Sequence, residues 1–470
     1  MPGPSDPVLT AAQMREAEHT LIAGGTSVDA LMLAAGQGAA DYVWRIAAGR
    51  PVTVLCGPGN NGGDGYVIAE TIRQRGGDVA VVAARDPVTS AARNACAAYG
   101  GAILSSPDER HGGVFVDCLF GTGLDRPLGV DDLGLLRGLA AAHALSIAVD
   151  LPSGVDSDSG AALNAELPAY DLTIALGAWK PAHFLMPAAF AMGALRLVPI
   201  GISAHGRAAF RVARPHLSAP AHGVHKYTRG LLGVIGGAMP GAALLAACAA
   251  QHSGAGYIKM LAGCGSHASY RVPADLVVDA RALADALTDA RLAALLVGPG
   301  LGRDSRAGEQ LAQILSVPTA AVLDADALVL LEPGLLSGRT APLIVTPHEG
   351  ELSALERAFG LARNGSKPDR AGALAVALSA VVVAKGADTV IAAPDGHLAF
   401  ASPASSWLST AGTGDVLAGI IASRLAAGAG PFAAACDGLW LHGEAARLCG
   451  PAFTAGQLAQ SVQAAYAACL

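Results

Sequence analysis

Two glycine-rich turns hold the residues of this sequence that are best placed to do chemistry. The first, at 57–64, reads GPGNNGGD and carries two amides and a carboxylate at the start of a predicted helix. The second, at 412–415, reads GTGD and also opens a predicted helix. Backbone N–H groups at a helix N-terminus can bind phosphate, and a carboxylate there, Asp415, can act as a base. A tight strand–helix turn and a helix-capping Asp415 would explain the same residues without a ligand.

Polar residues also follow later strands of the first half. Asp117 lies in VDCLFGTG, and Asp150 and Ser153 lie in AVDLPSG. In an open parallel sheet, ligands bind beyond the carboxyl ends of the strands. We therefore expect these three residues and Asn61 to converge on one pocket. Oxygen ligands of this type suit a hard cation or a sugar hydroxyl.

Short β-branched runs that alternate with alanine-rich helical stretches must position these loops. This alternation is typical of a parallel sheet covered by helices on both faces. A chain of 470 residues favours two domains. The pattern stops at 216–229, a predicted linker, so we expect two tandem α/β domains at 1–215 and 230–470. Strands are expected at 52–56, 79–83, 114–119, 147–151, 172–176 and 195–199 in the first domain, and at 231–235, 257–261, 295–297, 321–323, 343–345, 381–384 and 390–393 in the second.

Composition argues against several classes of protein. A net charge of −7 without a basic block argues against nucleic acid and anionic membranes as partners. The longest stretch without a charged residue, 230–258, is cut by glycine, proline and histidine, so no membrane span is expected. No signal-peptide pattern opens the sequence. None of the eight cysteines forms a C-x-x-C pair, so a cytoplasmic location is expected.

The loops of the first half together resemble the epimerase domain of the NAD(P)H-hydrate repair proteins. The motifs GNNGGDG, VDCLFGTG and DLPSG carry this resemblance, which runs from about residue 10 to about residue 215. It implies a Rossmann-like three-layer αβα domain, a K⁺ ion held by Asn61, Asp117 and Ser153, and Asp150 as the catalytic group against the reacting ring. The residues implied for binding the hydrated dinucleotide are Asn60, Asn61, Gly62, Gly63, Asp64, Gly121, Thr122, Gly123, Leu124, Asp125, Arg126, Pro127 and Asp150.

One position departs from this family's pattern. The early helix of the family usually carries an acidic and an amide residue in an LMENAG run. This chain reads LMLAAG at 31–36, with Leu33 and Ala34 at those two positions. The departure concerns the polar rim of the first site.

The second glycine turn carries a resemblance of its own. No P-loop motif occurs, so a phosphate site in the second half of the chain must be formed by a different kind of motif. Gly412, Gly414 and Asp415 resemble the anion hole and catalytic Asp of ribokinase-like kinases. With VGPGLG at 297–302, LDADAL at 323–328, TPHEGEL at 346–352 and AKGADTV at 384–390, they resemble the NAD(P)H-hydrate dehydratase domain. This resemblance implies nucleotide contacts from Lys385, Gly386, Ala387, Asp388, Thr389 and Gly414, and substrate contacts from Ala242, Gly300 or Gly302, His348 and Asp415.

Several of these residues have plain structural explanations. His348 could cap the helix that follows it, and Lys385 could be a surface lysine at a strand end. Asp324 and Asp326 are interpreted as turn and capping residues and are left out of the catalytic set. Trp179, Lys180 and Trp407 are interpreted as packing or rim residues.

Together the two resemblances imply a bifunctional repair enzyme. The first domain would interconvert the R and S hydrates of NADH or NADPH, and the second would dehydrate the S hydrate with ADP or ATP and Mg²⁺. A homo-oligomer is expected. The competing interpretations are a ribokinase-like small-molecule kinase with a regulatory nucleotide-binding first domain, an NAD-dependent dehydrogenase built on 57–62, and a first domain that only binds proteins.

Overall fold

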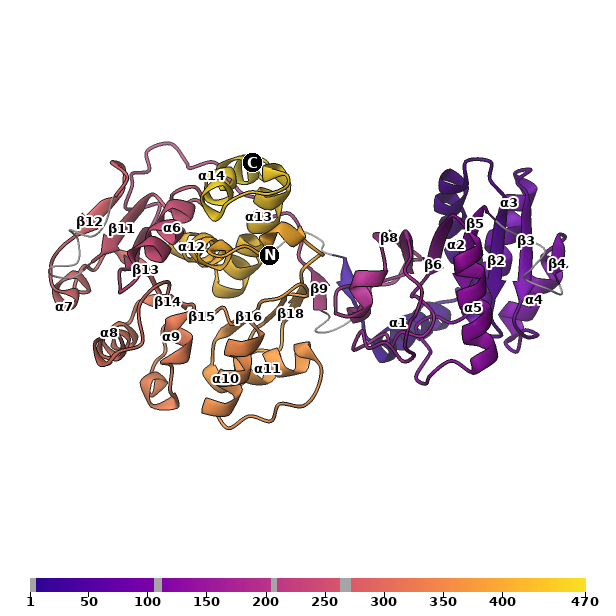
Figure 1. The fold of residues 1–470 in the computed structure, drawn as a ribbon, viewed down its shortest axis with the longest axis horizontal. Helices are drawn as coiled ribbons and strands as arrows, with labels where there is room; N and C mark the ends of the chain where they lie inside the picture. The colour runs from indigo at the N-terminus through magenta and orange to yellow at the C-terminus, as the bar shows by residue number, and fades with distance from the viewer. Residues whose placement is uncertain (1–5, 105–111, 204–208, 263–271) are drawn as a thin grey trace. The chain divides into compact units, whose positions relative to one another are not determined.

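A computed structural model describes residues 6–104, 112–203, 209–262 and 272–470 of the chain. These residues form two compact units, which divide between Ala209 and Phe210. Figure 1 colours the N-terminal unit indigo to magenta and the C-terminal unit through orange to yellow. The predicted linker, 216–229, contains no helix or strand. The two tandem α/β units confirm the predicted fold class.

A parallel sheet forms the centre of the N-terminal unit. Its strands run in the order β4-β3-β2-β5-β6-β7-β8, and every neighbouring pair is parallel. The central strands are buried along their whole length, because helices cover both faces. The strands are β2 (Val52–Cys56), β3 (Val79–Ala83), β4 (Ala102–Leu104), β5 (Val114–Cys118), β6 (Leu145–Val149), β7 (Leu172–Leu176) and β8 (Ala194–Val198).

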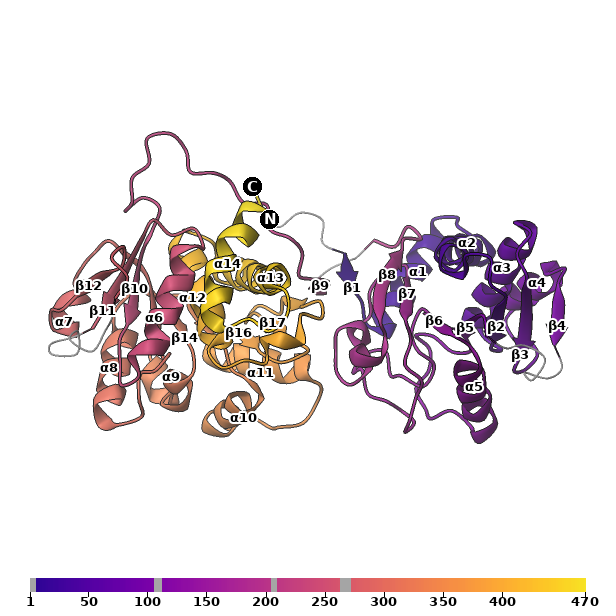
Figure 2. The same ribbon diagram turned by 45° about the horizontal axis from the view of Figure 1, so that its top comes forward.

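Helices cover this sheet on two sides and complete the three predicted layers (Figure 2). One apolar core joins α2 and α3 to the sheet, and a second joins α5 to its other face. A short strand, β1 (Pro7–Val8), precedes the first helix. The helices are α1 (Ala11–Ala23), α2 (Val28–Ala47), α3 (Asn60–Gln74), α4 (Ser90–Ala98) and α5 (Val130–Ala142).

The C-terminal unit has a larger, mixed sheet. Its strands run in the order β9-β18-β17-β16-β15-β14-β13-β10-β11-β12. The part from β16 to β12 is parallel, whereas β17 pairs antiparallel with β16 and β18. The strands are β9 (Ala209–Arg211), β10 (Leu231–Ile235), β11 (Tyr257–Leu261), β12 (Val277–Asp279), β13 (Leu292–Val297), β14 (Ala320–Leu323), β15 (Leu343–Val345), β16 (Val381–Ala384), β17 (Val390–Ala392) and β18 (Leu398–Phe400).

Two cores cover the faces of this second sheet. Alanine-rich helices α6 and α12 form one core with the sheet, and α8, α10 and α11 form the other. The helices are α6 (Pro240–Gln251), α7 (Leu283–Ala286), α8 (Ser305–Ser316), α9 (Asp326–Val329), α10 (Glu349–Ala358), α11 (Lys367–Leu378), α12 (Thr413–Ala426), α13 (Pro431–Cys449) and α14 (Ala455–Ala467). Within the described ranges no helix has the length and apolar character needed to cross a membrane.

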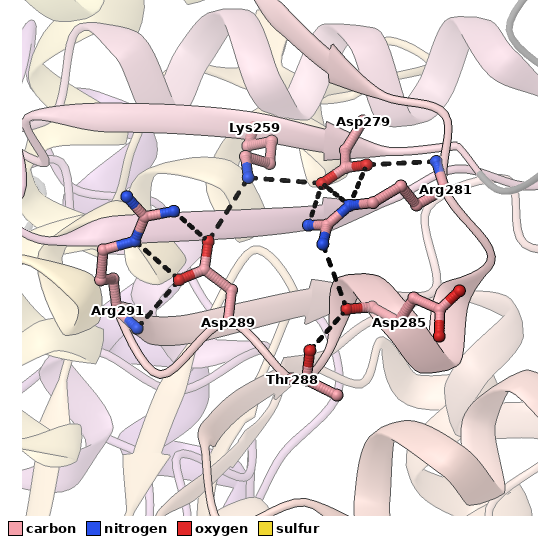
Figure 3. Close-up of polar contacts among 7 residues, drawn as sticks. All are labelled: Lys259, Asp279, Arg281, Asp285, Thr288, Asp289 and Arg291. Carbon is pink, nitrogen blue, oxygen red and sulfur yellow. Dashed lines mark hydrogen bonds and ion pairs between the residues drawn. The ribbon is translucent and has the colours of Figure 1, made fainter.

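A network of charges fixes the β12 edge of the C-terminal unit (Figure 3). Lys259 Nζ lies 3.3 Å from Asp279 Oδ2 and 3.5 Å from Asp289 Oδ2. Arg281 Nη2 lies 2.6 Å from Asp279 Oδ2, and Arg291 Nε lies 2.8 Å from Asp289 Oδ1. The arginine hydrogen bonds hold the pKa values of both aspartates well below their usual range. These ion pairs join β11, β12 and the start of β13.

Candidate active sites

The N-terminal unit contains a cavity of about 560 Å³ at the carboxyl ends of its strands. The predicted residues Asn60, Asn61, Asp64 and Asp150 line it. Residues 121–124 of the loop after β5 do so as well. The structure therefore brings these three predicted loops together around one space, as expected for an open parallel sheet.

The glycines of the first turn are needed for different structural reasons. A Cβ at Gly57 would lie 1.8 Å from Leu119 O, and a Cβ at Gly62 would lie 1.8 Å from Gly57 O. These two glycines are therefore required by close backbone packing. A Cβ at Gly59 would meet no atom within 4 Å, and this glycine precedes α3 and lines the cavity. It leaves bare backbone accessible at the helix N-terminus, where a phosphate could bind.

Of the three residues predicted to hold a cation, Asn61 lines this cavity, whereas Asp117 and Ser153 are not among its lining residues. Among the described residues, neither polar atom of the buried Asn61 amide has a hydrogen-bond partner. Asp117 is fully buried and accepts hydrogen bonds from Ser153 Oγ at 2.7 Å and from Tyr170 Oη at 2.6 Å. Burial raises the pKa of Asp117, and the Tyr170 bond opposes that rise. Amide, carboxylate and hydroxyl oxygens are the ligand types that suit a hard cation, and the Asn61 amide oxygen has no other partner among the described residues.

Asp150 follows β6 and has an unusual backbone conformation, with φ of +66°. One carboxylate oxygen accepts a bond from Lys180 Nζ. The other accepts bonds from Thr122 N at 2.8 Å and Thr122 Oγ1 at 2.6 Å. His183 Nε2 lies 2.9 Å from the Asp150 carbonyl. Burial favours a higher pKa for Asp150, but Lys180 and Thr122 outweigh it and hold the pKa below its usual value.

Two residues that sequence reasoning did not assign to this site line the same cavity. Lys180, interpreted as a packing or rim residue, is 1% exposed and contacts Asp150. Glu18 of α1 is the other. A lone lysine after a tryptophan and a glutamate on a surface helix have no local signal that marks them as functional.

Other predicted residues lie away from this space. Gly62 and Gly63 of the first turn are not among its lining residues, and neither are residues 125–127. Leu33 is 48% exposed, and α2 lines the cavity with Leu31, Met32 and Ala35 instead. The departure from the family's LMENAG run therefore lies outside the cavity lining.

In the C-terminal unit, Asp415 lies in the first turn of α12. Its half-buried carboxylate makes no hydrogen bond or ion pair with any described residue. Burial, and then the negative charge of Asp324, raises its pKa to about 6, while Lys385 opposes the rise. A Cβ at Gly414 would lie 3.5 Å from Lys385 Nζ, so this lysine lies at the N-terminus of the same helix.

Lys385 is a partly buried residue rather than a surface lysine. Its Nζ lies 2.6 Å from Asp324 Oδ1, which also accepts a 2.6 Å bond from Thr346 Oγ1. Asp324 is 1% exposed, so it is a buried acceptor and not a capping residue. Asp326 accepts a bond from Gly302 N at 3.0 Å and also contributes to the raised pKa of Asp415. Both aspartates therefore belong to this site, which the sequence interpretation missed.

The predicted nucleotide-binding loop, 385–389, has an ordered backbone of its own. Gly386 N donates to Thr389 Oγ1 at 3.2 Å, and Thr389 Oγ1 donates to Gly386 O at 2.9 Å. Lys367 Nζ lies 2.5 Å from Asp388 Oδ1 and 3.3 Å from Lys385 O. This loop is thus held in place by α11 before any ligand binds.

His348 caps α10, as its structural explanation proposed. Its Nδ1 accepts bonds from Gly350 N at 3.0 Å and Glu351 N at 3.1 Å. A neutral ring that accepts at Nδ1 carries its proton on Nε2. The side chain is 62% exposed and its Nε2 lies 3.3 Å from Glu351 Oε1. Capping therefore leaves Nε2 on the exposed side of the ring, close to Glu351.

The loop after β13 packs against the start of α6. Gly300 has φ of +65°, and a Cβ there would lie 2.2 Å from Met239 O, so a larger residue would not fit. Met239 N donates to Gly300 O at 2.9 Å, and Ala242 N donates to Met239 O at 3.3 Å. The structure therefore brings Ala242 near Gly300, as the predicted substrate contacts require.

Known proteins resemble both units of the chain. Residues 232–467 match the family described as NAD(P)H-hydrate dehydratase, and residues 28–182 match the family described as YjeF-related protein N-terminus. The bifunctional NAD(P)H-hydrate repair enzyme Nnr of Gloeobacter violaceus is 35% identical, over 93% of this chain and 92% of the relative. The enzyme of the same name from Mycobacterium leprae is 33% identical, over 93% of each chain.

A solved structure shows a weaker likeness. The ADP/ATP-dependent NAD(P)H-hydrate dehydratase from Bacillus subtilis, co-crystallised with ATP and Mg²⁺, is 28% identical and has a TM-score of 0.49. The match covers 54% of this chain and 95% of that one. The sequence relatives, matched over nearly their whole length, and the two family matches lead to one conclusion: this chain belongs to the family of bifunctional NAD(P)H-hydrate repair enzymes.

Proposed function

We propose that this chain repairs hydrated NAD(P)H in two steps. The N-terminal unit interconverts the R and S hydrates, and the C-terminal unit dehydrates the S hydrate with an adenine nucleotide, either ADP or ATP. The observation that carries this proposal is the carboxylate of Asp415, which lies unpartnered among the described residues at the N-terminus of α12, beside Lys385. This is where a phosphoryl group and its acceptor hydroxyl would meet.

The dehydration uses the chemistry of a kinase to make a leaving group. The hydrate carries a hydroxyl on a saturated ring carbon, and hydroxide leaves poorly. Asp415 takes the hydroxyl proton as the oxygen attacks the terminal phosphorus, and the bond from that phosphorus to the nucleotide's bridging oxygen breaks. The ring nitrogen then expels the new phosphate, and the departing phosphate takes the proton from the neighbouring carbon as the double bond is restored. A pKa of about 6 keeps Asp415 ionised at pH 7 yet basic enough to accept a proton.

The positive end of α12 and Lys385 would stabilise the phosphoryl group during transfer. Lys385 is fixed for this task by Asp324 at 2.6 Å. Mg²⁺ would neutralise charge on the nucleotide phosphates. Gly300 or Gly302, Ala242 and His348 would contact the hydrate, and residues 385–389 the nucleotide.

The epimerase step would take place in the cavity of the N-terminal unit, with Asp150 as an acid–base group. Asn61, Asp117 and Ser153 would hold K⁺, and the unpartnered buried amide of Asn61 supports this assignment. Asn60, Asp64 and residues 121–127 would bind the dinucleotide. We also propose a homo-oligomer located in the cytoplasm.

Pure S hydrate tests the dehydratase directly. The full-length protein is incubated with S hydrate and ADP, ATP or no nucleotide, and absorbance at 340 nm reports NAD(P)H. We expect recovery that requires a nucleotide, and we expect Asp415→Ala to abolish it. A phosphorylated hydrate that accumulates without any return of absorbance would favour the small-molecule kinase instead.

A further inference from the structure

Helix α1 forms one wall of the cavity in the N-terminal unit. Its start is tied to the segment that carries Lys180, because Leu9 N donates to Trp179 O at 2.8 Å and Trp179 N donates to Pro7 O at 3.0 Å. Met14 packs against Gly177, where a Cβ would lie 2.7 Å from the Met14 methyl carbon. Residues four apart share a helix face. Glu18 therefore follows Met14 on the face that α1 turns toward the cavity, which it lines.

The carboxylate of Glu18 makes no hydrogen bond or ion pair with any residue that the structure describes. It is half-buried and shares the cavity with Asp150 and Lys180. Burial raises the pKa of Glu18, Lys180 opposes the rise, and Asp150 adds to it. The remaining charged groups that act on it are His19 and Arg15 of α1 and Asp64 of α3. A half-buried carboxylate without a partner destabilises the fold, so its presence beside the reactive groups needs a reason.

Asp150 has the opposite environment. Lys180 and Thr122 bind both of its oxygens and hold its pKa low. Three carboxylates line the cavity: Glu18, Asp64 and Asp150. Burial raises the pKa of Glu18 and of Asp64, whereas the pKa of Asp150 is lowered. Asp64 is 8% exposed, and Glu18 is the more accessible of the two groups that are shifted toward the protonated form. Pairs separated in this way are typical of an acid and a base that act on one substrate.

We propose that Glu18 is the second acid–base group of the epimerase and acts together with Asp150, an inference that rests on the proposed function of this cavity. Glu18 gives a proton to the hydrate when Asp150 takes one, and the two exchange roles in the reverse direction. Lys180 is a positioning residue that keeps Asp150 ionised.

The epimerisation needs both groups because each turnover moves two protons. In a route through loss of water, Glu18 protonates the hydroxyl, the carbon–oxygen bond breaks, and the ring nitrogen supplies the pair that forms C=N. Water then adds to the other face of that carbon, and its extra proton goes to Asp150. In a route through ring opening, the base removes the hydroxyl proton, C=O forms as the carbon–nitrogen bond breaks toward nitrogen, and the acid protonates that nitrogen. The nitrogen then attacks the other face of the carbonyl and returns its proton to the group that gave it, while the other group protonates the new hydroxyl. Neither route consumes an oxidant or a reductant.

The test compares Glu18→Gln with the parent protein on pure R hydrate, following the S hydrate formed by chromatography after subtraction of the uncatalysed rate. Gln keeps the size of the side chain but cannot transfer a proton. We expect kcat for epimerisation to fall by at least about 100-fold, the lower end for general acid–base groups, with KM changed little. Glu18→Asp should keep a substantial part of kcat, because aspartate can also transfer a proton although its side chain is one methylene shorter.

Two controls separate this inference from the proposed function. Glu16→Gln removes the same charge from an exposed position on α1 and should keep parental epimerase activity. Dehydration of pure S hydrate should be unchanged in all three variants. If Glu18→Gln keeps kcat within about threefold of the parent, Glu18 transfers no proton and the inference is wrong. If Glu18→Gln and Glu18→Asp lose activity equally through KM or thermal stability, Glu18 is a structural residue and the inference is again wrong. A parent protein without epimerase activity would instead overturn the proposed function.

Discussion

The two units each place an aspartate at their site, and the two environments are opposite. Asp150 is surrounded by donors from Lys180 and Thr122, and its pKa lies below the usual value. Asp415 has no partner among the described residues, and its pKa is raised to about 6. The difference follows from the chemistry proposed for each unit. A base that must accept a proton during phosphoryl transfer benefits from a raised pKa, whereas in the proposed acid–base pair the ionised member is the one that accepts the proton.

The charge network at the β12 edge shows that a shifted pKa does not by itself mark a site. Asp279 and Asp289 also have lowered pKa values, caused first by their hydrogen bonds with Arg281 and Arg291. Both aspartates join strands, and neither lines the large cavity of the other unit (Figure 3). What distinguishes Asp150 is the cavity that it lines, and what distinguishes Asp415 is its carboxylate without a described partner at the N-terminus of α12.

The largest effect is expected for Asp415→Asn. The substitution keeps the shape of the side chain but removes the proton acceptor. We expect dehydration of S hydrate to slow by about 1,000-fold or more, within the range of general-base catalysis. Recovery of absorbance at 340 nm measures it, and epimerisation of R hydrate by the same variant serves as the matched control. Dehydration within about tenfold of the parent rate would remove Asp415 from the mechanism.

Asp150→Asn should act on the other unit alone. We expect epimerisation to slow by about 100-fold or more, because one member of the acid–base pair is lost. Chromatographic separation of the hydrates measures the exchange. The same variant should dehydrate pure S hydrate at the parental rate. Intact epimerisation would show that another group does the work assigned to Asp150.

Lys180→Met tests whether the lysine sets the protonation state of Asp150. Without Lys180, burial dominates and raises the pKa of Asp150, so the carboxylate ionises only at higher pH. Epimerisation should fall about tenfold to 100-fold at pH 7 and recover partly as the pH rises. A pH–rate profile of epimerisation checks this. An equal loss at every pH would mean that Lys180 has only a structural role.

The smallest effect concerns stability. The pKa of Asp415 is near 4 when unfolded and about 6 when folded. The ionised group therefore destabilises the fold, with no penalty below pH 4 and the full penalty above pH 6. Because the group is partly exposed, we expect Asp415→Asn to raise the free energy of unfolding by only about 1 kcal/mol at pH 8, and by nothing at pH 4. Denaturant unfolding at both pH values measures it. An equal gain at both would contradict the origin of the shift.

Local sequence signals predicted most of the architecture. Strands such as Val52–Cys56 and Leu343–Val345 agree with the structure because buried parallel strands read as short apolar runs. The three-residue strands β4, β9, β12 and β18 were missed. None of them is buried along its whole length, unlike β15, which has the same length and was predicted. The C-terminal unit also contains antiparallel pairing between β16 and β17 that an alternating pattern does not reveal.

The candidate site residues also differ in whether a local sequence signal could reveal them. Residues in motifs, such as Asn61 and Asp415, could be found from sequence because they stand beside glycines at predicted helix starts. Glu18 could not, because its place in the cavity depends on how α1 is anchored at Trp179, more than 150 residues away. Asp324 was found in a motif but read as a turn residue, because its partner Lys385 lies 61 residues further along the chain. Such contacts depend on the tertiary fold.

The most direct test of two-step repair uses a mixture of R and S hydrates with the full-length protein. Absorbance at 340 nm is followed with ADP, with ATP and with neither. If both units work, the parent protein should return all of the hydrate to NAD(P)H, and only when a nucleotide is present. The Asp150→Asn variant should return only the part of the mixture that is S hydrate. No recovery with either nucleotide would contradict the repair function, and recovery of only the S share by the parent protein would contradict an active epimerase.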